Sequence, residues 1–406
     1  MFKHRHLFFL PSFYLLITFS LAYFIYLLDV IKWERPPLEL HYWCIITILT
    51  AFFSVAVHSH RCSVIINERS FKAKIKAPFI VGKVSFLIVL IGLAIGVLGI
   101  IKYILDYANF LGAFGIFYSF FTEDTGQLRS LAENVDSVGT QLSYFSWLAA
   151  FIITAEVAVK NIGKKWIFAI VGVVMLNSLF LDRTRPVWLI FTCALIYFLI
   201  TYDSYSKKKI IYFISGICTF FISIFILIGS LLGKGADDVN YTKFNLPPSI
   251  QPLFLYLTSS FAYLGRLIYV DAPCNYSPAR VTYPIQKVLL KFKLVDQPPN
   301  QILDFFTVPL LTNVGTFLEP FFQDGGRLFL VLGIILHTFI FDRVVLYLMK
   351  NISQMAVIAI STICFINFIA FFVPKITSTA TWFILLFAYL LSKYHSMQPK
   401  KPISIL

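Results

Sequence analysis

Charged residues are scarce in this chain: Asp, Glu, Lys and Arg make up 13% of its 406 residues, whereas soluble globular domains carry about 25%. In their place stand repeated apolar runs of roughly 17 to 24 residues, long enough to cross a hydrocarbon core of about 30 Å as helices. This pattern excludes a soluble enzyme and a disordered protein. It also excludes an outer-membrane barrel, whose strands would alternate apolar and polar residues over about ten positions. The sequence predicts an all-α polytopic integral membrane protein.

Metal-binding and nucleotide-binding motifs are also missing. The six cysteines include no C-x-x-C pair and no cluster with histidine, so neither a zinc site nor a disulfide framework is expected. The chain has no D-x-D motif and no P-loop, which argues against metal-dependent sugar transfer and ATP-driven transport. We therefore predict no metal and no cofactor.

The net charge of +14 does not point to a nucleic-acid partner, because the basic residues lie between apolar runs rather than on one dense face. With the N-terminus inside, the short cytoplasmic connections are rich in Lys and Arg and hold only two acids, Glu68 and Asp203. Both termini are therefore expected in the cytoplasm, with the protein in the inner membrane. The predicted spans are residues 7–28, 40–58, 83–101, 141–159, 165–181, 187–202, 210–232, 328–349, 354–373 and 379–393.

This count divides the chain into three parts. Residues 1–233 hold seven helices, residues 234–327 form a long periplasmic loop, and residues 328–406 hold three helices and a cytoplasmic tail. The loop contains two further apolar stretches, 252–270 and 302–318. Either both are re-entrant or interfacial helices, or both span the membrane and give twelve helices with the same end orientation. The internal prolines and Arg266 favour the re-entrant alternative.

Two arginines occupy a short turn on the outer side, in the sequence Asp182-Arg183-Thr184-Arg185-Pro186. One interpretation is a solvated hairpin whose arginines meet lipid headgroups. The other is a phosphate clamp, since two guanidinium forks bind diphosphate oxygens bidentately and stabilise the charge of a diphosphate leaving group.

The end of the long loop carries a second group of charged residues, Glu319, Asp324 and Arg327. Asp324 is placed to cap the helix that follows, and Gly325 and Gly326 permit a tight turn there. Alternatively, a carboxylate and an arginine at this rim act as catalytic base and phosphate ligand.

Other ionisable residues have two interpretations each. Arg266 and Arg280 are either a snorkelling and a loop arginine or ligands of a lipid diphosphate. Packing partners are expected for His337, for Glu156 with Lys160 one turn away, and for Asp342 with Arg343.

The order of these features resembles the oligosaccharide repeat-unit polymerases (Wzy-type O-antigen polymerases). Arg183 and Thr184 are similar to an Arg-Ser/Thr turn of that family, although Asp182 stands where a small residue is expected. After the long loop, the motif N-x-x-T-x-x-x-P-x-x-x-D-x-G is matched by Asn313, Thr316, Pro320, Asp324 and Gly326. The resemblance covers topology over nearly the whole chain and residue identity over a small part of it.

The resemblance implies a metal-independent membrane glycosyltransferase with a GT-C-like helical fold. Its substrate would be an undecaprenyl-diphosphate-linked oligosaccharide, polymerised at the periplasmic face for lipopolysaccharide or related polysaccharide biosynthesis. Membrane lipids and a polysaccharide chain-length regulator are the expected partners, and nucleic acid is not. The candidate catalytic residues are Glu319 and Asp324, and the candidate diphosphate ligands are Arg183, Arg185, Arg266, Arg280 and Arg327. A lipid-linked oligosaccharide flippase or transporter, or the related O-antigen ligase, remains an alternative.

Overall fold

The computed structural model describes most of the chain. The described residues are 2–80, 83–111, 137–180, 184–202, 250–272, 274, 276–296, 306–308 and 311–397, with isolated positions 212, 216, 223, 242, 243 and 247. Arg183 and nearly all of the predicted span 210–232 therefore lie outside the described residues.

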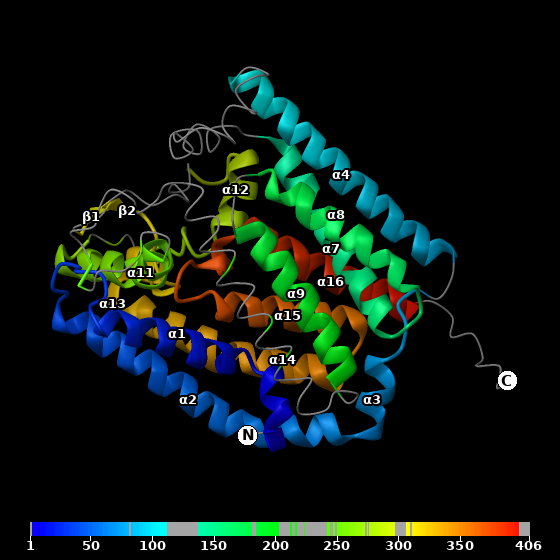
Figure 1. Cartoon of the computed structure of the whole chain (residues 1–406), viewed down its shortest axis with the longest axis horizontal. Helices are drawn as coiled ribbons and strands as arrows, with labels where there is room; N and C mark the ends of the chain where they lie inside the picture. The colour runs from blue at the N-terminus through cyan, green and yellow to red at the C-terminus, as the bar shows by residue number, and fades with distance from the viewer. Residues whose placement is uncertain are drawn as a thin grey trace.

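The described chain is almost entirely helical (Figure 1). The first half contains η1 (Phe2–Phe9), α1 (Pro11–Leu27), α2 (Leu38–Asn67), α3 (Arg69–Ile75), α4 (Lys83–Leu111), α7 (Val138–Ala158), η2 (Lys164–Trp166), α8 (Ile167–Ser178) and α9 (Thr184–Thr201). The second half contains α11 (Gln251–Tyr269), α12 (Tyr283–Lys291), β1 (Phe306–Thr307), β2 (Leu311–Thr312), α13 (Leu318–Ile335), η5 (Leu336–Ile340), α14 (Phe341–Lys350), α15 (Gln354–Phe368), η6 (Lys375–Thr377) and α16 (Thr379–Met397).

Five helical segments of the described chain are long and apolar enough to cross a membrane, and three shorter helices are also apolar. The five are Leu38–Asn67, Lys83–Asn109, Val138–Ala158, Thr184–Thr201 and Leu318–Lys350. Side chains on their outer faces are apolar and exposed, among them Leu49, Phe52 and Phe53 of α2 and Leu98 of α4. An exposed apolar belt of this kind matches a lipid environment rather than water, so the described helices indicate a membrane protein.

Three helical segments extend well beyond the predicted spans. α4 continues past residue 101 to Leu111. α2 continues past residue 58 to Asn67, and α13, the π-helical turn η5 and α14 run on from Leu318 to Lys350. The apolar stretch 302–318 is not a helix in its described part: β1 and β2 form an antiparallel pair there. This finding contradicts both predictions for this stretch, the re-entrant or interfacial helix and the spanning helix.

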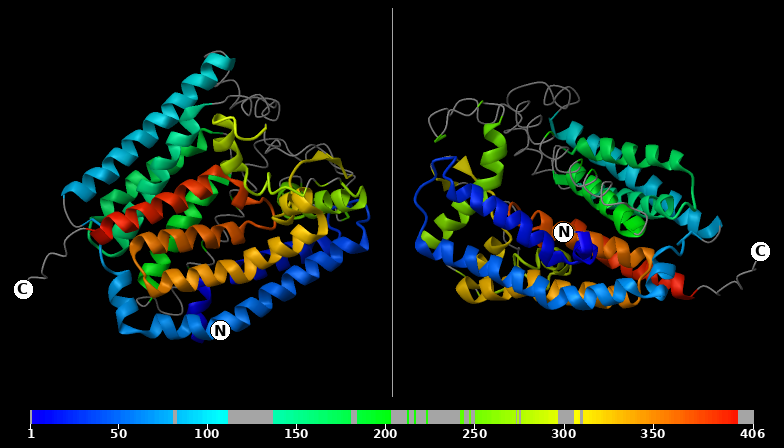
Figure 2. Two further views of the ribbon diagram at one scale, coloured as in Figure 1. Left: turned by 180° about the vertical axis from the view of Figure 1, so that it is seen from behind. Right: turned by 60° about the horizontal axis from the view of Figure 1, so that its bottom comes forward.

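The helices pack side by side around two apolar clusters (Figures 1 and 2). One cluster joins α7, α9, α15 and α16, and the other joins α1, α2, α11 and α13. The structure has two distinct ends. The loop end carries α11, α12 and the β1–β2 pair, and the N-terminal end carries η1, α3 and the turn between α7 and η2 (Figure 1).

α4 and α7 approach each other through small residues. A Cβ atom on Gly99 would lie 2.6 Å from Cβ of Leu142, and one on Gly96 would overlap the backbone of Ser146. Close approach through glycine and serine is typical of helix pairs in membranes, where dispersion contacts replace the hydrophobic effect as the main attraction.

Glu156 does not pair with Lys160 as expected. Its carboxylate is fully buried and accepts backbone hydrogen bonds from Phe79 (2.7 Å) and Ile80 (3.0 Å), and a side-chain hydrogen bond from Asn161 (2.5 Å). Unsatisfied backbone donors of a buried loop attract a carboxylate more strongly than an exposed lysine does. Glu156 thus fixes the connection before α4 against the end of α7.

Asp342 also has partners other than the expected Arg343. Its buried carboxylate accepts hydrogen bonds from the backbone and side chain of Ser12 and from Oγ of Ser54 (2.7 Å). Nδ1 of His58 lies 3.6 Å away, and Arg343 donates to the other nitrogen of that ring. This polar cluster ties α14 to α1 and α2.

Candidate functional site

The loop end brings Glu319, in the first turn of α13, next to Arg280, which precedes α12. The Glu319 side chain is 1% exposed and the Arg280 side chain 14% exposed. Arg280 Nε lies 3.1 Å from Oε1 of Glu319, although the two atoms are not aligned as a hydrogen bond. The sequence predicted each residue as a site residue, and the structure places the two in one buried ion pair.

Asp324 belongs to the same cluster and holds the backbone of the Arg280 turn. Its carboxylate accepts hydrogen bonds from the backbone N–H of Arg280 (3.0 Å) and Val281 (2.9 Å), and its carbonyl accepts from Ser277 (3.0 Å). The interpretation of Asp324 as a cap of the following helix is therefore wrong, because these oxygens face a loop more than forty residues earlier in the chain.

The predicted glycine turn is confirmed as a kink within α13. Gly325 and Gly326 have non-helical backbone angles, and Gly326 has a φ of 60° with a ψ of −145°. Only glycine adopts this conformation readily. A Cβ atom on Gly325 would overlap the ring of Phe329. The kink separates the short segment that carries Glu319 and Asp324 from the long apolar helix.

Thr316, another motif residue, lies fully buried at the start of α13. Its hydroxyl accepts a hydrogen bond from the backbone of Leu318 (3.3 Å), and the neighbouring Phe317 donates to the carbonyl of Ala370 (2.8 Å). These bonds fasten the beginning of α13 to the connection after α15. Thr316 thus has a positioning role for Glu319, three residues later.

Arg327 lies just past the kink, and its guanidinium contacts the carboxylates of two residues. It donates to both oxygens of Glu39 (2.7 and 3.0 Å), and its third contact is Asp271 at 3.4 Å. More than half of the Arg327 side chain is exposed. In this arrangement its guanidinium is already occupied by a bidentate carboxylate.

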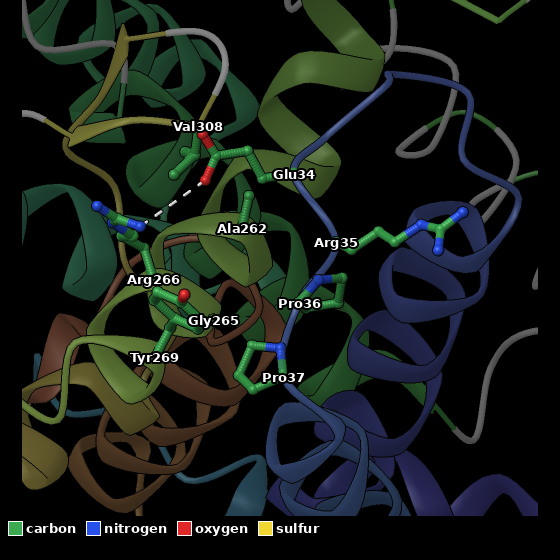
Figure 3. A pocket seen from close by; sticks show the side chains of 9 residues that line it. All are labelled: Glu34, Arg35, Pro36, Pro37, Ala262, Gly265, Arg266, Tyr269 and Val308. Atoms are coloured by element: carbon green, nitrogen blue, oxygen red, sulfur yellow. Dashed lines mark ion pairs between the residues drawn. The ribbon is translucent and has the colours of Figure 1, made fainter.

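Arg266, near the end of α11, lines a separate outer cavity of about 230 Å³ (Figure 3). Its Nη1 lies 4.0 Å from Oε2 of Glu34, and its guanidinium stacks over Tyr269 at 5.5 Å. Figure 3 shows that Glu34 faces Arg266 across the cavity while Arg35 points away from it. This cavity is open to solvent, since Arg266 and Glu34 are both exposed.

Arg185, in the first turn of α9, is buried among aromatic rings. Its Nη1 donates to Ser143 (3.1 Å), and its guanidinium lies 3.8 Å from the ring centre of Phe180. Only 8% of the residue is exposed, so it is not part of a solvated hairpin. The proposed clamp with Arg183 stays a prediction, because Arg183 lies outside the described residues.

Three further charged residues, which the sequence did not single out, lie at contacts of the predicted site residues. Glu34 and Glu39 partner the outer arginines, and Lys375 donates to Thr184 (2.7 Å) at the start of α9. Each lies within two residues of a proline at the edge of an apolar run, as in Glu34-Arg35-Pro36-Pro37-Leu38-Glu39 and Pro374-Lys375. A charged residue next to proline at the boundary of an apolar helix is the sequence feature that could have identified them.

The described residues therefore assemble Arg280, Glu319 and Asp324 into one buried cluster, with Arg266 and Arg327 in separate contacts at the same end. No group of three His, Cys, Asp or Glu side chains suited to a metal ion occurs among these residues. A carboxylate beside a guanidinium in a water-poor site suits proton transfer next to an anionic group. Comparisons with protein-family models, with curated proteins and with solved structures found no match for this chain.

Proposed function

We propose that this protein is an inner-membrane glycosyltransferase that polymerises undecaprenyl-diphosphate-linked oligosaccharide repeat units at the periplasmic face, with ten spans and a GT-C-like fold. The observation that carries the proposal is the buried Arg280–Glu319 pair at the loop end. It supplies an anion-binding group and a proton acceptor in one place, on the long connection that the resemblance assigns to substrate binding.

In the proposed reaction, a hydroxyl of the incoming repeat unit attacks the anomeric carbon of the growing glycan on its lipid diphosphate. The new glycosidic C–O bond forms as the bond to the diphosphate breaks, and the electron pair leaves with the diphosphate. Glu319 takes the hydroxyl proton, and Arg280 stabilises the charge on the leaving group. Arg183, Arg185, Arg266 and Arg327 are proposed as further diphosphate ligands. In this role Arg185 would first leave Ser143, and Arg327 would first leave Glu39.

The buried Asp342–His58 cluster favours a second candidate, transport of a lipid-linked oligosaccharide. Ionisable groups inside spanning segments are frequently parts of transport pathways. Both oxygens of Asp342, however, are already occupied by serine donors, which is the pattern of a fixed structural contact. Transfer of finished polymer onto another acceptor, as by a ligase, would use the same Arg280–Glu319 pair.

A deletion strain complemented with variants tests the proposal. Glu319→Gln removes the proton acceptor with little change of shape, and the polymerisation rate should fall about 10²- to 10⁴-fold. Arg280→Lys keeps the positive charge but loses the planar guanidinium that binds phosphate bidentately, so this variant should restore only part of the polymerisation rate. The matched controls are Lys291→Gln in α12 and Glu68→Gln at the N-terminal end, both exposed.

The sugar ladder on the lipid core separates the candidates. A single repeat on the core, with normal membrane levels of the Glu319→Gln variant, supports polymerisation. Bare core with repeats retained inside indicates transport, and bare core with long lipid-linked polymer indicates ligation. Full-length polymer from Glu319→Gln would remove this residue as the base.

A further inference from the structure

A second cavity lies at the N-terminal end, on the opposite side of the molecule from the Arg280–Glu319 pair. It has a volume of about 850 Å³, within the range of about 300 to 1,000 Å³ typical of small-molecule sites. Its walls come from the ends of α7 and α9, the turn between α7 and η2, and the end of α3. Three lysines reach it: Lys76 at the end of α3, Lys160 in the turn after α7, and Lys164 at the start of η2.

The charges at this cavity are unbalanced. No acidic residue is among the described residues that line it. None of the three ammonium groups has an ion pair within the described chain, in contrast to Arg266, Arg280 and Arg327 at the other end. The nearest acid of α7, Glu156, is fully buried and engaged by Phe79, Ile80 and Asn161. Among its described lining residues, the cavity is therefore positively charged and has no acidic counter-ion.

Below the lysines, the same cavity is apolar. Val157, Ile162 and Ile200 form part of its wall. The adjoining start of α8 exposes Phe168 to 81%, which places the apolar belt of the molecule directly beside the opening. This combination suits a ligand that has an anionic head and an apolar body.

We propose that this cavity binds an anionic phospholipid of the surrounding bilayer, with its phosphodiester among Lys76, Lys160 and Lys164 and an acyl chain against Val157, Ile162 and Ile200. Ammonium groups bind phosphate oxygens as compact point charges, and basic pockets between membrane helices are suited to anionic lipid headgroups. Lys160 adopts a positive φ of 63° at the end of α7, a backbone conformation that residues other than glycine rarely adopt. The site is independent of the glycosyltransferase proposal.

The test compares lipids on purified protein in neutral detergent. Binding of dioleoylphosphatidylglycerol and dioleoylphosphatidylcholine is titrated by native mass spectrometry. The triple variant Lys76→Gln, Lys160→Gln, Lys164→Gln removes the site's charges. A matched variant, Lys74→Gln, Lys165→Gln, Lys350→Gln, removes three exposed lysines from the same end that do not line the cavity.

A lysine near a phosphate is worth about fivefold in affinity. The triple variant is therefore expected to lose roughly 100-fold in phosphatidylglycerol affinity, while the matched variant keeps the wild-type value. Equal affinities of the wild type for the two lipids, or equal losses in both variants, would overturn the proposal. Should the triple variant not be recovered, Lys160→Gln and Lys164→Gln alone must each lose about fivefold.

Inorganic phosphate is the probe for a free anion. Competition by phosphate at millimolar concentration, as strong as that of added phosphatidylglycerol, would show a site for the free ion and overturn the assignment to a lipid. Displacement by phosphatidylglycerol alone supports it.

Discussion

The two ends of the molecule differ in whether their positively charged side chains are paired with carboxylates. At the loop end, Arg280, Arg327 and Arg266 each lie within 4.0 Å of a carboxylate, from Glu319, Glu39 and Glu34 respectively. At the N-terminal end, Lys76, Lys160 and Lys164 surround a cavity without an acid among its described lining. Guanidinium–carboxylate pairs fix the geometry of a loop, whereas unpaired ammonium groups remain available to a ligand from outside.

Breaking the buried pair at the loop end should have the largest effect on stability. Glu319→Ala removes the carboxylate that pairs with Arg280, and removal of one partner of a buried pair costs about 3–5 kcal/mol of unfolding free energy. Thermal unfolding in detergent measures it. The double variant with Arg280→Ala should be less destabilised than the sum of the single variants, and simple additivity would mean that the two groups do not interact.

The kink that supports this pair is the next test. Gly326→Ala forces a side chain into a backbone conformation that glycine alone adopts readily, at a cost of about 1–3 kcal/mol in unfolding free energy. Gly172→Ala in α8 is the control, since no atom lies within 4 Å of its added Cβ and alanine favours a helix by about 1 kcal/mol. A Gly326→Ala protein as stable as the wild type would show that the kink relaxes without strain.

The exposed Arg327–Glu39 pair at the same end should contribute less to the unfolding free energy. Arg327→Ala removes a bidentate contact with Glu39, but the arginine is 55% exposed, and exposed ion pairs contribute about 0.2–1 kcal/mol. The loss should shrink further in high salt. A double-mutant cycle with Glu39→Gln measures the coupling, and a value above about 2 kcal/mol would place this pair with the buried one.

The lysines of the N-terminal end should have the smallest effect on folding. Lys164→Gln breaks no side-chain ion pair or hydrogen bond within the described chain, so its unfolding free energy in neutral detergent should stay within about 0.5 kcal/mol of the wild type. Added phosphatidylglycerol should stabilise the wild type more than this variant. A large loss without lipid would mean that the lysine supports the fold itself.

Most helices could be predicted from the sequence, because an apolar run of spanning length has few alternatives to a helix in lipid. Their ends could not. The helix α2 continues to Asn67 through a stretch that contains His58, His60 and Arg61, since polar side chains leave a membrane without ending the helical backbone. The helix prediction for 302–318 is wrong for the opposite reason. The stretch is apolar enough for a helix, but its described part forms a strand pair.

The candidate site could likewise be predicted in part: its residues could be identified from the sequence, but their contacts could not. Glu319, Asp324 and Arg280 were each identified as charged residues near the outer face, which is a local property. Their mutual contacts join positions about forty residues apart and leave no periodic signal along the chain. The capping prediction for Asp324 failed because a local rule competed with backbone donors supplied by a distant loop.

The hydrogen bonds of Asp324 also couple the three charged residues of this cluster to one another. Its two carboxylate oxygens hold the turn at Arg280 and Val281, and the side chain of Arg280 in this turn pairs with Glu319. A displacement of the turn would therefore release Asp324 and separate Arg280 from Glu319 in the same movement. The guanidinium and the two carboxylates thus stay together, or come apart, as one unit.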